Sequence, residues 1–221
     1  MSDSSKITGK LHRVLAWIEL ILVYGLIECA LWSQQPSTRN RFALVALIAV
    51  IVFIAVDLLR PDHTTVRRLG LGMPTTTAAG IVLAATLGTT LFFVLGVRWA
   101  GGAAPINGTW PSVSQSWAYV LWAFLQEFVL QSFFFTRCED LFGSETAPWV
   151  AATLFAAAHL PSPLLTTFTF IAALFFCEVF MRNRSIYPIA LMHAVLGLIV
   201  GATMPDSLLH HMRVGIGYLK Y

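Results

Sequence analysis

The sequence predicts an all-α polytopic bundle that spans a membrane, and three observations lead to this prediction. Hydrophobic residues make up 57% of the 221-residue chain, charged residues only 11%, and the mean hydropathy is +0.73. Soluble domains average roughly 25% charged residues, so this composition excludes an ordinary water-soluble globular protein. The apolar residues also gather into runs, most of which approach the roughly 20 residues that a helix needs to cross a bilayer. We therefore expect a single integral membrane domain over residues 1–221.

Seven apolar runs are predicted to be membrane helices joined mostly by short connections. The first run lacks the small-residue cleavage site of a secretory signal peptide and is interpreted as a retained span. Two longer breaks, at 60–74 and 98–116, are rich in turn-forming or basic residues and are predicted to be surface loops. The seven runs cover residues 14–32, 42–59, 77–97, 117–136, 148–160, 164–181 and 186–203.

The fifth run is too short to cross a bilayer. It covers residues 148–160 and would form a helix of about 20 Å at 1.5 Å per residue. Pro161-Ser162-Pro163 then ends it. A helix that ends at membrane depth leaves carbonyl groups unpaired, which is tolerated only where the backbone is packed in protein or faces a watery cavity. His159 stands at this broken end, a suitable place for a residue that must meet water.

The distribution of basic residues predicts the orientation. With seven spans and a cytoplasmic N-terminus, nine Lys and Arg residues fall inside and five outside, and basic loops tend to stay in the cytoplasm. We expect a protein of the plasma (inner) membrane. The net charge of +3 is spread over loops and gives no reason to expect nucleic acid as a partner.

Ionisable residues inside the apolar runs are candidates for function. Glu127 lies about ten residues from either end of run 117–136, where a charged side chain costs about 2.5 to 3.5 kcal/mol on insertion scales. It therefore needs a partner, a water pocket or a chemical role. The other acidic residues lie closer to helix ends and are interpreted as structural, reaching headgroups, pairing with Arg or staying protonated. These are Glu19, Glu28, Asp57 and Glu178.

Two histidines in later runs, His159 and His193, join Glu127 in a possible site. Taken singly, either is more simply a satisfied core residue. One acid and two imidazoles together suit general-base catalysis on a water molecule, with the imidazoles transferring protons or stabilising an oxyanion. No His-Glu-x-x-His pair or zinc-type ligand cluster is present, so no metal or other cofactor is expected.

The order of these residues resembles the CAAX-protease and bacteriocin-processing (CPBP) family of glutamic intramembrane endopeptidases. That family carries Glu-Glu-x-x-x-Arg, Phe-x-x-x-His and His-x-x-x-Asn on successive membrane helices. Here residues 126–131 read QEFVLQ, 155–159 read FAAAH and 193–197 read HAVLG. The resemblance covers about residues 117–201, the expected catalytic core region. It implies that the first Glu and the second-motif His activate water, and that the later His and the Asn hold the oxyanion.

The chain departs from this pattern at three positions. Gln126 replaces the first acid, Gln131 replaces the Arg and Gly197 replaces the Asn. A primary amide cannot act as a general base, and glycine has no side-chain donor. Loss of one Glu and one Arg together leaves the formal charge of the pocket unchanged, which indicates a compensated rewiring.

Three assignments are possible for the rewired site. In the first, Glu127 is the base, His159 orients the water and His193 is the oxyanion donor, while Gln126 and Gln131 supply neutral hydrogen bonds. The protein is then an endopeptidase that processes a membrane-associated or tail-bearing protein. In the second, the same polar residues only fix helix packing in a non-catalytic binding or immunity-type module. Acyl transfer at the same pocket is a third alternative.

Overall fold

The computed structural model describes residues 2–59, 65–99 and 112–220. The predicted surface loops at 60–74 and 98–116 therefore lie partly outside the described residues. Within the described ranges the regular elements are all helical, and one isolated bridge joins Leu71 to Ser185. The predicted all-α fold is confirmed.

Most of the long helices extend beyond the apolar runs into polar sequence. Helix α2, for example, begins at Pro36 and not at residue 42, because proline suits the first position of a helix and interfacial polar residues continue it. The elements are α1 (Ser2–Trp32), α2 (Pro36–Leu58), α3 (Thr65–Arg68), α4 (Thr76–Trp99), α5 (Val113–Glu127), η1 (Phe128–Phe135), α6 (Thr136–Phe142), α7 (Ala147–Ala157), α8 (Pro163–Asn183), α9 (Tyr187–Thr203), α10 (Asp206–Leu209), η2 (His210–Met212) and α11 (Ile216–Leu219).

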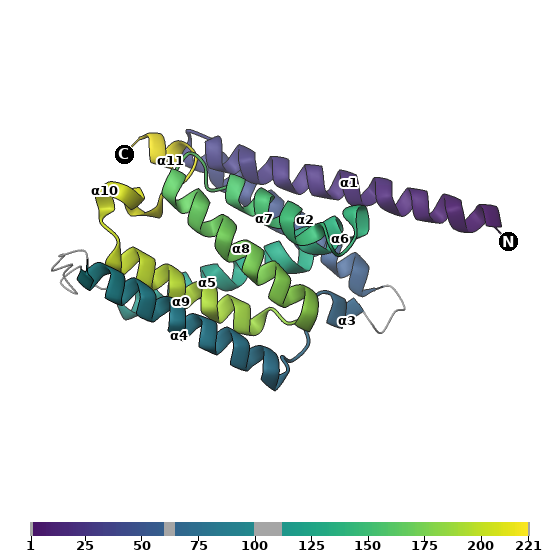
Figure 1. Ribbon diagram of the computed structural model, residues 1–221. Helices are drawn as coiled ribbons and strands as arrows, with labels where there is room; N and C mark the ends of the chain where they lie inside the picture. Colours follow the sequence, from purple (N-terminus) through teal and green to yellow (C-terminus); the bar gives the residue numbers. More distant parts are fainter. Residues whose placement is uncertain (1, 60–64, 100–111, 221) are drawn as a thin grey trace.

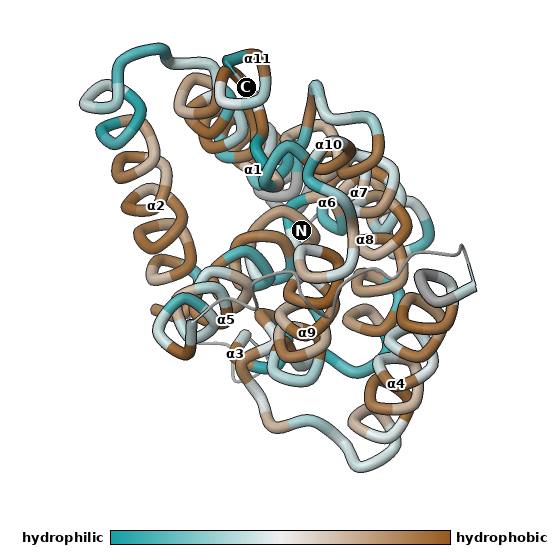
Figure 2. The backbone as a smooth tube through the Cα atoms, turned by 90° about the vertical axis from the view of Figure 1, so that its left-hand side faces the viewer, coloured by the Kyte–Doolittle hydropathy of each residue, from teal (hydrophilic) through white to brown (hydrophobic). Residues whose placement is uncertain are grey.

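Five helical segments of the described chain are long and apolar enough to cross a membrane. A sixth is reached if α9 and the following α10–η2 segment, bent by 120°, count as one span. Helix α7 is apolar but short, as predicted for the fifth run. Figure 2 shows hydrophobic residues along the long helices and hydrophilic residues near their ends. The chain is an integral membrane protein.

Helix pairs build the bundle. The most extensive contacts join α7 to α8, α1 to α2, and α9 to both α5 and α4. In Figure 1, α9 lies beside α4, while α1 runs along the opposite side of the bundle. The core is rich in aromatic side chains, and its largest buried rings come from η1 and α8: Phe133, Phe135, Phe176 and Phe180.

Basic residues from three segments contact α6 at the end of the bundle where the N-terminus lies (Figure 1). A guanidinium nitrogen of Arg13 donates to the Leu141 carbonyl at 3.1 Å. Arg68 pairs with Asp140, and Arg184 pairs with Glu139 at 2.5 Å. These contacts gather cationic residues from α1, α3 and the end of α8 on one side of the bundle.

A buried ion-pair cluster centres on Arg137, which is only 4% exposed. Its Nε donates to Glu19 Oε2 at 2.6 Å, and one terminal nitrogen donates to Asp57 Oδ2 at 2.6 Å. The sequence left open whether these two acids reach headgroups, pair with Arg or stay neutral. They pair with Arg, and the cluster ties α1 and α2 to α6.

Candidate active site

The candidate site begins where α5 changes into a π-helix. We expected a regular helix over residues 117–136, but α5 ends at Glu127 and the wider π-helix η1 follows. Every residue from Leu130 to Cys138 is buried, so this segment is enclosed by the bundle on all sides. Stretches of π-helix are rare and often occur at functional sites, because the wide turn shifts side chains out of their usual register.

Glu127 is fully buried and both of its carboxylate oxygens have partners. His193 Nδ1 lies 2.8 Å from Oε1, and the Gln131 side-chain amide donates to Oε2 at 3.1 Å. A buried carboxylate needs such partners because leaving it without them is costly. Glu127 therefore has the hydrogen-bond partners that an acidic residue in the middle of an apolar run needs.

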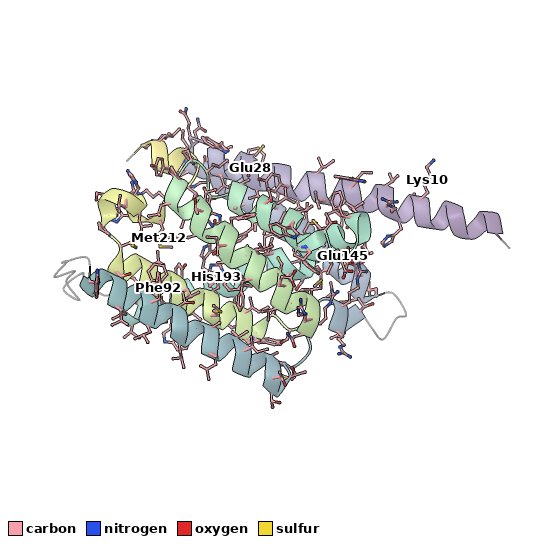
Figure 3. All side chains as sticks on the ribbon, viewed as in Figure 1. Lys10, Glu28, Phe92, Glu145, His193 and Met212 are labelled. Carbon is pink, nitrogen blue, oxygen red and sulfur yellow. The ribbon has the colours of Figure 1, made fainter. Side chains whose placement is uncertain are left out.

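The His193 ring is held between aromatic rings and a carboxylate. It stacks on Phe176 with 5.7 Å between ring centroids and meets Phe155 edge-on at 6.1 Å. Because the Glu127 carboxylate can only accept, the His193 Nδ1–H donates to it. Nε2 is then the nitrogen left for chemistry. Figure 3 shows His193 in the interior of the bundle.

His159 lies in the turn that follows α7, as the broken fifth run predicted. Its Nδ1 is 2.7 Å from the Phe155 carbonyl oxygen. A carbonyl only accepts, so Nδ1 carries the proton in this hydrogen bond and Nε2 of the neutral ring has a free lone pair. The ring also packs on Phe155 at 4.8 Å between centroids. His159 is thus fixed in the tautomer that a general base at Nε2 requires.

A cavity of about 460 Å³ lies between α1, α2, α5 and α7, within the size range of ligand pockets. Most of its lining is apolar. The polar side chains that line it include Gln126, His159, His193 and Tyr119. Glu127 and Gln131 are not among the lining residues, and Glu127 lies behind the His193 ring.

The structure thus brings all five sequence-predicted residues into one region but on two levels. Gln126, His159 and His193 face the cavity, whereas Glu127 and Gln131 form the layer behind His193. The neighbouring positions 126 and 127 point in different directions because successive residues on a helix are about 100° apart. The amide, and not the carboxylate, therefore faces the cavity.

Tyr119 also lines the cavity, and no sequence motif marks it. It comes from α5, two turns before Glu127, and it reaches Gly197 of α9. The signal available in the sequence was Gly197 itself, because a glycine in place of a larger residue leaves space for a side chain from elsewhere. Among the described residues, no group of three His, Cys, Asp or Glu side chains is arranged to hold a metal.

Comparison with known proteins agrees with the motifs. Residues 108–199 match the family model described as type II CAAX prenyl endopeptidase Rce1-like. No curated protein and no solved structure matches the chain. The match includes α7 and all five predicted site residues. It confirms the resemblance and supports membership of the chain in the CPBP family, whose members include membrane proteases.

Proposed function

We propose that the protein is an intramembrane endopeptidase that hydrolyses a peptide bond in a membrane-associated protein. The observation that carries this proposal is the pair of imidazoles at one cavity, each with its Nδ1–H engaged by a different acceptor. Two histidines oriented in this way leave two Nε2 atoms for one reaction. The matched family is named for endopeptidase activity, which supports the same reaction class.

The positions of the side chains favour a division of roles that differs from the first expectation. Glu127 has both oxygens engaged and does not line the cavity, so we assign it to position His193. His159, with its Nε2 lone pair free, is the general base. His193, oriented by the Glu127 carboxylate and with a proton on each ring nitrogen in this role, donates a hydrogen bond from Nε2 to the oxyanion.

In the proposed hydrolysis, His159 takes one proton from water and later gives it to the leaving amine. His159 Nε2 takes a proton from water while the water oxygen attacks the carbonyl carbon, and His193 stabilises the negative charge that forms on the carbonyl oxygen. His159 next gives its proton to the amide nitrogen. The C–N bond breaks, and a carboxylic acid and an amine leave. Gln126 offers both a donor and an acceptor for holding the peptide backbone.

The lining supports a substrate with an apolar tail. Besides its few polar groups, the cavity is bordered by many aliphatic side chains, including Ile27, Leu44 and Val50 of α1 and α2. An apolar surface of this kind gains free energy by covering apolar groups, at about 25 cal/mol per Å². We assign the substrate to proteins that carry an apolar or lipidated terminal segment.

We also propose that the N-terminus is cytoplasmic and that the membrane is the plasma (inner) membrane. The basic side chains that meet at α6 would then face the cytoplasm, as the bias of basic residues in loops predicts.

The test compares peptide termini by mass spectrometry in membranes from cells that carry the wild type, Glu127→Gln or His159→Ala. Equal amounts of folded protein are checked in each membrane, and Arg182→Gln, an exposed helix position, serves as the control. Termini present with the wild type and the control but lost in both site variants would support proteolysis and reveal the substrate. Identical termini in all four would reject it and favour the non-catalytic module.

A further inference from the structure

Tyr119 lies with its hydroxyl against the backbone of α9, one helical turn from His193. Gly197 follows His193 by four residues, so the two positions share one face of α9. A β-carbon added at Gly197 would overlap the Tyr119 hydroxyl and would lie 2.5 Å from the ring carbon Cζ. Only glycine at this position permits the approach.

This requirement distinguishes Gly197 from other helical glycines of the chain. A β-carbon at Gly25, Gly80 or Gly88 would meet nothing within 4 Å. The contact between Gly197 and Tyr119 is therefore a specific fit of one side chain into space left by another residue. The space borders both the large cavity and a smaller one of about 80 Å³, each of which His193 also lines.

The Tyr119 hydroxyl has no hydrogen-bond partner among the side chains and backbone groups of residues 2–59, 65–99 and 112–220. Tyr119 is partly buried, and tyrosines in such positions usually find a partner for this group. A phenol can donate one hydrogen bond, and the neighbouring cavity is where the proposed reaction would take place. Because Tyr119 lines the cavity, its hydroxyl is available to a group that enters there.

We propose that Tyr119 is a second oxyanion donor, which acts beside His193 from the place that a side chain at position 197 would otherwise occupy. This inference rests on the proposed endopeptidase function. The hydroxyl of Tyr119 and Nε2–H of His193 then donate to the same carbonyl oxygen as its charge develops, and Gly197 provides space without providing a donor. Tyr119 would be a catalytic residue, because its hydroxyl contacts the reacting oxygen.

The experiment uses full-length protein purified in detergent and, as substrate, membranes from cells that lack it. The rate at which wild-type-dependent peptide termini appear is followed by mass spectrometry. Tyr119→Phe removes only the hydroxyl and should slow the rate about 100-fold, as the loss of one oxyanion donor does in other enzymes. Tyr187→Phe, which removes an exposed hydroxyl on the same helix as His193, is the matched control and should keep the wild-type rate.

Two double variants distinguish the effect of a hydrogen-bond donor near His193 from the effect of merely filling the space that Tyr119 occupies. Tyr119→Ala with Gly197→Asn returns an amide donor to the vacated space and should be at least about 10-fold faster than Tyr119→Ala with Gly197→Leu, which fills the space without a donor. This comparison also decides the matter if Tyr119→Phe folds poorly. The thermal midpoint of each variant is measured in the same detergent.

Three results are informative. A slow Tyr119→Phe together with recovery in the Asn double variant would support the donor. Wild-type rates for Tyr119→Phe, or equal rates for the two double variants, would overturn it while proteolysis itself stands. Absence of new termini with the wild-type protein would overturn the proposed function and, with it, the role of Tyr119.

Discussion

His193 Nδ1 lies 2.8 Å from Glu127 Oε1, so the two side chains form one polar unit across α9 and α5. Sixty-six positions separate them in the sequence. The carboxylate fixes the direction of the imidazole and leaves Nε2 toward the cavity. A carboxylate that orients an imidazole acts through it and need not touch the substrate.

Replacing Glu127 with Gln should therefore impair turnover more than substrate binding. The neutral amide lacks the negative charge that accepts the His193 Nδ1–H and fixes the direction of the ring, so kcat should fall at least about 100-fold while KM changes little. Both constants are measured on a peptide that spans the cleavage site found in membranes. Glu178→Gln, at an exposed acid paired with Arg182, should keep the wild-type kcat. A large rise in KM with kcat intact would contradict the positioning role.

Replacing His159 with Gln should remove the general base. The side chain keeps a hydrogen-bonding group of similar length but loses the basic Nε2, and kcat should fall about 100- to 10,000-fold. His12→Gln on α1, away from the cavity lining, is the control. If His159→Gln retained full activity while Glu127→Gln did not, the base would instead be His193 with Glu127 behind it.

Replacing Arg137 with Met should destabilise the bundle. The change deprives Glu19 and Asp57 of the cation that both contact at 2.6 Å. Removing one member of a buried ion pair costs about 3 to 5 kcal/mol of unfolding free energy. Thermal unfolding in detergent should show a clear drop in the midpoint. Arg182→Met removes the cation of an exposed pair and should cost at most about 1 kcal/mol; equal losses for the two variants would argue against the cluster.

Replacing Gly70 with Ala should also destabilise the protein. Gly70 has φ +74°, which non-glycine residues rarely adopt, and an added β-carbon would overlap the Phe180 ring. A cost of about 1 to 3 kcal/mol is expected from the backbone conformation alone. Gly25→Ala, with open space around it in the middle of α1, should be neutral or slightly stabilising. An unchanged melting temperature for Gly70→Ala would contradict this packing.

Single cysteines should report the orientation in intact cells. The α1–α2 turn and the α6–α7 turn lie at opposite ends of the bundle (Figure 1), and each holds an exposed residue, Gln34 in the first and Glu145 in the second. In a Cys29→Ser background, a membrane-impermeant maleimide should label Gln34→Cys from outside, whereas Glu145→Cys should react only after the cells are opened. The reverse pattern would place the N-terminus outside.

Much of the fold could be predicted because it depends on local sequence. The seven apolar runs all became helices, and the short one ended at Ala157, in the turn that holds His159 and leads to Pro161. The change from α-helix to π-helix after Glu127 could not be predicted. The apolar composition of residues 117–136 suits an α-helix and a π-helix equally well. The choice between them depends on the packing that surrounds η1 on every side.

The sequence by itself determined that the protein spans a membrane, that it is helical, and which polar residues its interior holds. These properties follow from composition and from the length of apolar runs. Only the tertiary structure decided that Gln126 faces the cavity while Glu127 lies behind His193, and that Tyr119 occupies the space beside Gly197. The physical reason is that the rotation of each helix about its axis, and the pairing of helices far apart in the chain, are set by side-chain packing across the whole bundle.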